Sequence, residues 1–135
     1  MKKISFITQN LDTTCFPVAL INCGLFLNKK LLLDKYIEFC CCKTGGALNQ
    51  EKAIIDANLP LLKTDDIEDV LRNGGIITIM HPIYNLHAVF VYPDGKYSIA
   101  VNSWLGPNET VFDKGFHKFL ANPPNNNIWY INNFN

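Results

Sequence analysis

The sequence changes character at Gly75, and this change limits the folds that the chain can adopt. Before Gly75, apolar residues recur at helical spacing in four segments, 13–30, 31–42, 48–59 and 64–75. After Gly75, short segments rich in Val, Ile, Tyr and Phe are typical of strands. Helices followed by strands indicate an α+β fold. We therefore expect one domain of 135 residues, with helices over about 1–74 packed on an antiparallel sheet over about 75–135.

The clearest hairpin signal is the segment 87–104, HAVFVYPDGKYSIAVNSW. Two apolar strands flank a Pro-Asp-Gly sequence, which favours a tight turn. If the turn is centred on Asp94 and Gly95, His87 lies directly opposite Asn102. Facing residues have Cβ atoms about 5 Å apart. We therefore expect the Asn102 amide to bind one nitrogen of the His87 ring.

Composition and charge exclude several classes of function. Hydrophobic residues make up 48% of the chain and charged residues 18%, which is typical of a chain with a packed core. Twelve basic residues balance twelve acidic ones, so neither nucleic acid nor an anionic membrane is the expected partner. No apolar run reaches the roughly 18 residues of a membrane span, and the first residues do not form a secretory signal. We therefore expect a cytoplasmic protein without a membrane span, unless it is exported by a route that the sequence does not reveal.

The five cysteines do not form a disulfide or metal pattern. Their number is odd, and Cys40, Cys41 and Cys42 are consecutive, so their side chains point to different sides of any helix or strand. We interpret these three as small core residues and exposed thiols, and Cys23 as a core residue. No Walker loop, GxGxxG sequence or metal-ligand spacing is present, so we expect neither a cofactor nor a metal site.

Cys15 lies at the start of a helical segment that is apolar on most sides. Thr13 or Thr14 can cap this helix, and Pro17 is tolerated in its first turn. A helix N-terminus lowers the pKa of a thiol, and a nearby imidazolium lowers it further, which favours the nucleophilic thiolate. The backbone N–H of Cys15 and the side-chain amide of Gln9 would supply two donors to an oxyanion.

Four residues together supply the parts of an acyl-transfer site. Gln9 is an oxyanion donor, Cys15 a nucleophile, His87 a base and Asn102 a residue that orients the base. Each of them taken alone is more typical of a core, loop or strand-edge position. Their order, spacing and cross-strand placement together favour the site.

Other polar residues compete less well for these roles. Pro82 after His81 indicates a bend, and His117 lies in a segment with weak structural signals. The sequence places no amide partner beside either histidine, although His81 could line the same pocket as the proposed base. Asp65 and Asp66 are interpreted as charges at the start of a helix that Thr64 caps and that Gly74 stops.

These segments resemble those of papain-like cysteine peptidases. QNLDTTC followed by a helix is similar to the family's oxyanion glutamine and nucleophile, HAVFV to its histidine strand, and NSWLG to its Asn-Ser-Trp-Gly strand end. The order Gln, Cys, His, Asn also agrees. A proline two residues after the cysteine and a short chain are more similar to the small C39-type peptidases, which trim peptide leaders. The resemblance implies a compact papain-like fold with N-terminal helices packed on a C-terminal antiparallel sheet.

The resemblance also implies roles for individual residues. It implies a catalytic set consisting of Cys15 as nucleophile, His87 as base, Asn102 as orienting residue and Gln9 as oxyanion donor. Trp104 would shield the contact between asparagine and histidine from water, and Trp104 and Phe16 would lie beside the substrate. The expected reaction is cleavage of a peptide or amide bond in a peptide or protein substrate, through a thioester.

Two alternatives stay open. A thioester does not choose its acceptor, so the same site can deamidate glutamine or transfer an acyl group to an amine. Phe16 stands beside the nucleophile, where a small residue is expected. A bulky side chain there could block the groove and leave a papain-like binding module without catalysis.

Overall fold

The structure is a computed structural model that describes eight stretches of the chain. They are residues 4–8, 14–40, 42–43, 46–47, 49–82, 85–102, 108–121 and 127–132. The helices among them are α1 (Cys15–Phe26), α2 (Leu33–Cys40), α3 (Gln50–Asp56), α4 (Ile67–Asn73) and α5 (Lys114–His117). In the described stretches, no helix has both the length and the apolar character needed to cross a bilayer.

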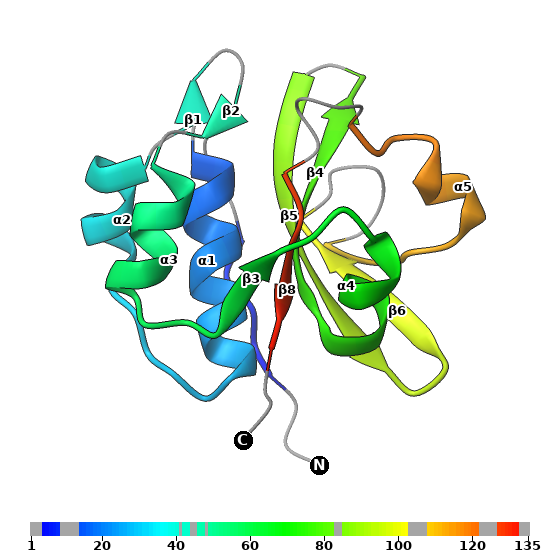
Figure 1. The fold of residues 1–135 in the computed structure, drawn as a ribbon, viewed down its shortest axis with the longest axis horizontal. Coiled ribbons are helices and arrows are strands. Elements are labelled where there is room, and N and C mark those ends of the chain that lie inside the picture. The colour runs from blue at the N-terminus through cyan, green and yellow to red at the C-terminus, as the bar shows by residue number, and fades with distance from the viewer. Residues whose placement is uncertain are drawn as a thin grey trace.

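A six-stranded antiparallel sheet forms the centre of the molecule (Figure 1). Its strands, in spatial order, are β3 (Leu61–Lys63), β8 (Trp129–Ile131), β4 (Gly75–His81), β5 (Asn85–Asp94), β6 (Tyr97–Val101) and β7 (Glu109–Val111). A separate two-stranded ribbon joins β1 (Cys42–Lys43) and β2 (Gly46–Ala47). The expected α+β class is confirmed.

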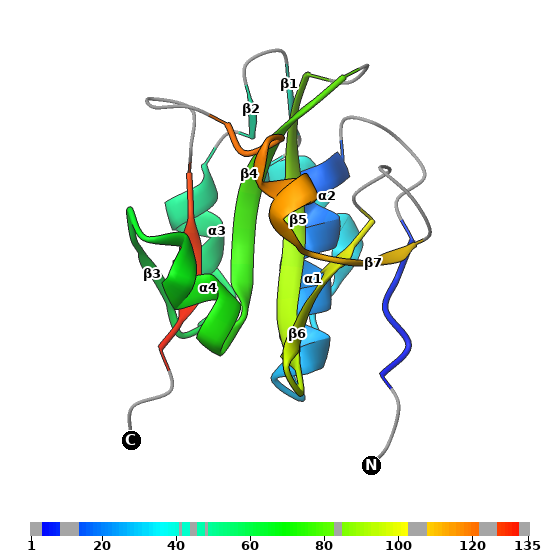
Figure 2. The same ribbon diagram turned by 90° about the vertical axis from the view of Figure 1, so that its right-hand side faces the viewer.

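Helices cover both faces of the sheet, with α1, α2 and α3 on one side and α4 and α5 on the other (Figures 1 and 2). The expected division at Gly75 is therefore too simple. β3 precedes that residue and belongs to the sheet, while α4 packs on the face opposite to α1. A three-residue strand such as β3 is too short to show a period in the sequence.

Alternation along β5 separates the two cores. Ala88 and Phe90 lie in the core cluster that contains α1, whereas Val89 and Val91 lie in the cluster that contains residues of α4 and α5. This follows from the period of two in a strand, which directs successive side chains to opposite faces. β5 therefore reads as a continuous apolar run because both of its faces are covered.

The α1 helix forms as expected. It is buried from Cys15 to Gly24, and it ends before Asn28, which adopts a left-handed conformation with φ of 59°. Gly24 allows close packing, since a Cβ atom there would lie 2.8 Å from the carbonyl oxygen of Lys29. The N-cap residue is Thr14, but its side chain does not cap the helix.

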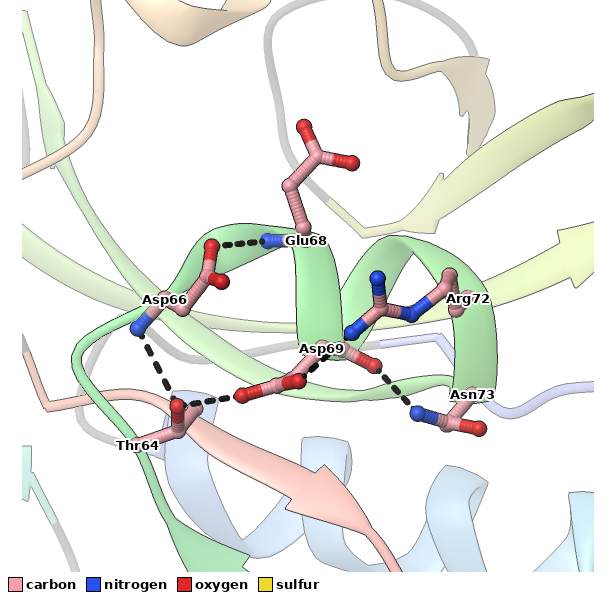
Figure 3. A network of polar contacts seen from close by, with 6 residues as sticks. All are labelled: Thr64, Asp66, Glu68, Asp69, Arg72 and Asn73. Carbon is pink, nitrogen blue, oxygen red and sulfur yellow. Dashed lines mark hydrogen bonds and ion pairs between the residues drawn. The ribbon is translucent and has the colours of Figure 1, made fainter.

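The α4 helix is capped by Asp66 and not by the expected Thr64 (Figure 3). The Asp66 carboxylate accepts a hydrogen bond from the Glu68 N–H at 3.0 Å. The Thr64 hydroxyl instead accepts from the Asp66 N–H at 3.1 Å and donates to Asp69 at 2.6 Å. The expected stop at Gly74 is confirmed, because this glycine is the C-cap with φ of 86°.

The β5–β6 hairpin forms where expected, but its turn lies one residue further along the chain. Asp94 pairs with Tyr97, so the central turn residues are Gly95 and Lys96. Gly95 has φ of 63°, and a positive φ at the first central position is typical of a type II′ turn. The expected register is therefore wrong by two residues, because Pro93 and Asp94 belong to the strand.

Candidate active site

Cys15 is the first residue of α1, at the end of the molecule where β5 begins (Figures 1 and 2). The helix packs against β5. Cys15 is 3% exposed and belongs to the core cluster on the α1 side of the sheet.

His87 is the third residue of β5 and is 1% exposed. Its Nε2 atom lies 2.7 Å from the backbone oxygen of Asn102. A carbonyl oxygen only accepts, so in the neutral ring Nε2 carries the hydrogen and Nδ1 carries the lone pair. Burial lowers the pKa of His87 to about 4, the Asn102 carbonyl opposes this change, and nearby His81 adds to it. The ring is therefore neutral at pH 7, the state in which a base can accept a proton.

Asn102 contacts His87 through its backbone, which differs from the expected side-chain contact. The register extends to Phe90 opposite Val101, so position 102 continues opposite Val89 and not opposite His87. Asn102 also turns into a left-handed conformation, with φ of 60°. Its side-chain Nδ2 donates to the Ile7 carbonyl at 2.7 Å, away from the histidine.

His87 lies in the first part of β5, before the pairing with β6 begins. Pairing between β5 and β6 ends at Phe90 opposite Val101, and the described part of β6 does not pair with the beginning of β5. By strand alternation, His87 starts from the face opposite to α1, and its ring reaches the backbone of Asn102, just after the end of β6. Cys15 belongs to the core cluster on the α1 side of the sheet. In Figure 2, α1 lies behind β5 and β6.

The other two histidines lie in different surroundings. His81 is 5% exposed, and its ring centroid lies 6.1 Å from that of His87, in an edge-on arrangement. The expectation that His81 lines the same region is consistent with this contact. His117 is half-buried in α5 and stacks at an angle on Phe112, with centroids 4.9 Å apart.

Three expected site residues need separate comment. Gln9 and Trp104 lie outside the described residues, so their roles stay predictions. Phe16 is 0% exposed and belongs to the core cluster with α1 and β5. The expectation that Phe16 borders the substrate is wrong for this conformation, because its ring is packed inside the protein.

The remaining cysteines lie in different elements of the structure. Cys23 is 0% exposed, and burial raises the pKa of its thiol to about 12. Cys40 ends α2 and Cys42 begins β1, while Cys41 lies outside the described residues. Within the part of the chain that the structure describes, no cluster of three or more His, Cys, Asp or Glu side chains is arranged to hold a metal ion.

Two residues that the sequence did not single out lie next to the site. Ile7 accepts the Asn102 hydrogen bond through its backbone, and Asn22 of α1 binds both polar groups of the Ile7 backbone. One signal for Asn22 was present in the sequence. It is the only amide side chain in the apolar helix CFPVALINCGLF, and a buried amide needs hydrogen-bond partners.

Comparison with known proteins gives no match to a family model, to a curated protein or to a solved structure.

Proposed function

We propose that this chain is a thiol-dependent hydrolase of peptide or amide bonds, with a papain-like arrangement in which Cys15 is the nucleophile and His87 the base. The observation that carries the proposal is the state of the imidazole. His87 is buried and neutral, its Nε2 is held by the Asn102 carbonyl at 2.7 Å, and its Nδ1 is the nitrogen that can take a proton. Cys15 is the first residue of α1, and this helix packs against β5, the strand that carries His87.

The proposed reaction uses His87 as a proton carrier. The Cys15 thiol gives its proton to Nδ1 as the sulfur attacks the carbonyl carbon of the substrate. Because the low pKa of His87 disfavours the imidazolium, we propose that proton transfer accompanies the attack and does not precede it. The imidazolium then protonates the leaving nitrogen, the C–N bond breaks, and a thioester is left on Cys15.

Water completes the cycle in the proposed second step. His87 removes a proton from water as the water oxygen attacks the thioester, the C–S bond breaks, and the proton returns to the sulfur. The backbone N–H of Cys15 and the side chain of Gln9 are the proposed donors to the oxyanion in both steps. An amine in place of water would give acyl transfer, and a glutamine side chain as substrate would give deamidation.

Thiol alkylation tests the proposal, with Cys23 as an internal control in the same helix. At pH 7 we expect iodoacetamide to modify Cys15 faster than Cys23, whose pKa is raised to about 12. His87→Gln keeps a donor for the Asn102 carbonyl but removes the base, and should slow the reaction of Cys15 alone. Cys15→Ser and His87→Gln should each lower hydrolysis of a peptide library by about a hundredfold or more. If Cys15 of the native protein reacts no faster than Cys23, the proposal fails.

A second candidate function is a papain-like binding module without catalysis. The burial of both residues at the start of α1 favours it, since Cys15 is 3% and Phe16 is 0% exposed. An extended peptide would still bind to such a protein, but the sulfur would stay out of its reach. Peptide binding that survives Cys15→Ser, combined with slow alkylation of Cys15, would identify this function.

A further inference from the structure

Two asparagines from distant parts of the chain form hydrogen bonds with the backbone of Ile7. The Ile7 N–H donates to Oδ1 of Asn22 at 2.8 Å, and Nδ2 of Asn22 donates to the Ile7 carbonyl at 3.2 Å. Nδ2 of Asn102 donates to the same carbonyl at 2.7 Å. The N-terminal segment, α1 and the residue that follows β6 are therefore joined at the backbone of one residue, Ile7.

The cost of burying these amides indicates that the arrangement serves a purpose. Asn22 is 0% exposed and Asn102 is 3% exposed. An amide moved from water to an apolar interior loses stability unless hydrogen bonds replace its contacts with water. Both polar atoms of the Asn22 side chain form a hydrogen bond with Ile7, whereas Oδ1 of Asn102 is buried and accepts no hydrogen bond in the described part of the chain. Asn102 therefore stays in a strained, partly unsatisfied state, which is typical of residues whose position matters.

The same asparagine that is tied to Ile7 holds the imidazole. The backbone oxygen of Asn102 contacts Nε2 of His87, and the left-handed φ of 60° sets the direction of that carbonyl. Its side chain is anchored on Ile7, which is itself held by Asn22. A continuous chain of hydrogen bonds thus runs from the middle of α1 to the histidine ring.

We propose that Asn22 is a positioning residue for His87. By fixing Ile7, it fixes Asn102, whose carbonyl keeps the hydrogen of the neutral imidazole on Nε2 and leaves the lone pair on Nδ1. The structural link stands by itself, and its effect on turnover rests on the proposed function.

Nuclear magnetic resonance of protein labelled with ¹⁵N-histidine tests the link without using activity. The ¹⁵N shifts of the two ring nitrogens report which one carries hydrogen. The rate of amide hydrogen exchange at Ile7 reports the hydrogen bond from its N–H to Asn22. Asn22→Leu has a similar shape and removes both bonds to Ile7. Asn102→Gly tolerates the left-handed φ and removes only the bond to the Ile7 carbonyl. Cys23→Ala is the control, since the side chain of this buried neighbour in α1 takes no part in the hydrogen bonds between Asn22 and Ile7.

The three variants are expected to change the two signals in different ways. Asn22→Leu should speed Ile7 amide exchange about tenfold, and both asparagine variants should move the His87 ring shifts toward a mixture of the two tautomers. Asn102→Gly should leave Ile7 exchange slow, and Cys23→Ala should change neither signal. Faster Ile7 exchange in Asn22→Leu with unchanged His87 shifts would overturn the proposal. If Asn22→Leu does not fold, unchanged shifts in Asn102→Gly overturn it.

Kinetics distinguish this proposal from the proposed function. If the wild-type protein hydrolyses amides, Asn22→Leu should lower kcat about tenfold with little change in KM, because the base is misplaced but the substrate groove is not. If the wild-type protein has no hydrolase activity, the proposed function fails. The ring shifts of His87 then still decide whether Asn22 positions it.

Discussion

Burial of the His87 ring couples its protonation to the stability of the fold. The ring is 1% exposed, and its pKa falls from 6.5 to about 4. Between these two pH values, the unfolded chain binds a proton that the native state does not. The native state therefore loses stability as the pH falls through this range, and the full contribution is present above pH 6.5.

We predict that His87→Gln weakens this dependence on pH. Between pH 7 and pH 4, the free energy of unfolding of the wild-type protein should fall by about 3 kcal/mol more than that of the variant. Urea unfolding at several pH values measures the difference, and carboxylates that titrate in both proteins cancel in the comparison. Parallel curves for the two proteins would show that His87 binds protons equally in the folded and unfolded states.

For single residues, the sequence was sufficient where a position depends only on its neighbours in the chain. Cys15 at a helix start and His87 at a strand start follow from patterns a few residues long. The contacts of Asn22 and Asn102 with Ile7 could not be predicted in the same way. They join positions 15 and 95 residues apart in the sequence, and only packing of the whole chain decides which backbone group meets a buried amide.

The start of α4 shows how one short element is held by its side chains. Asp66 caps the helix, Thr64 links the cap to Asp69, and Asp69 pairs with Arg72 at 2.9 Å (Figure 3). The sequence indicated a capped acidic helix start, but Thr64 and Asp66 are both good N-cap residues. Which of them caps depends on the backbone angle at which β3 leads into the helix, and sequence patterns do not contain that angle.

We predict that Asp66→Ala lowers the free energy of unfolding by about 1 kcal/mol, because the Glu68 N–H loses its acceptor. Asp65→Ala is the matched control, since this neighbouring exposed carboxylate does not cap the helix. The midpoint of urea unfolding should fall for Asp66→Ala at constant slope. A similar fall for both variants would indicate a general effect of charge and not a cap.

For the β5–β6 hairpin too, the sequence predicted the elements but not their detailed geometry. Two apolar segments on either side of a turn sequence predicted both strands. Its turn was placed one residue too early, since Pro-Asp-Gly suggested that aspartate and glycine occupy the centre. In the structure, Pro93 and Asp94 still pair with β6, and this moves the partner of every residue by two. A small error in a turn therefore changes the predicted geometry of the site.

In the whole molecule, β8 lies between β3 and β4 in the sheet, although it follows both of them in the sequence. Gly75 allows β8 to pack close to β4, because a Cβ atom at this position would lie 2.0 Å from the carbonyl oxygen of Trp129. Trp129 also donates from Nε1 to Gln50 of α3 at 2.9 Å, which ties the sheet to a helix on its α1 side. The sequence predicted that β4 and β8 are strands, but it did not predict that they are neighbours in the sheet.

We predict that Gly75→Ala destabilises the protein by about 3 kcal/mol or more, because β8 must move away from β4. Gly95→Ala is the matched comparison. A Cβ atom at Gly95 meets no atom within 4 Å, so only the left-handed φ of 63° has a cost, about 1 to 2 kcal/mol. Thermal or urea unfolding of the two variants gives the ranking. A smaller loss for Gly75→Ala than for Gly95→Ala would contradict the close approach.

The position of β8 also determines when the protein can fold during its synthesis. Leu61 pairs with Ile131 and Gly75 with Tyr130, so two strands share a neighbour that is synthesised much later than either of them. Until β8 is synthesised, one edge of β3 and one edge of β4 have unpaired backbone groups. We expect these edges to stay unpaired until β8 has left the exit tunnel, and the nascent chain to need protection by chaperones up to that moment.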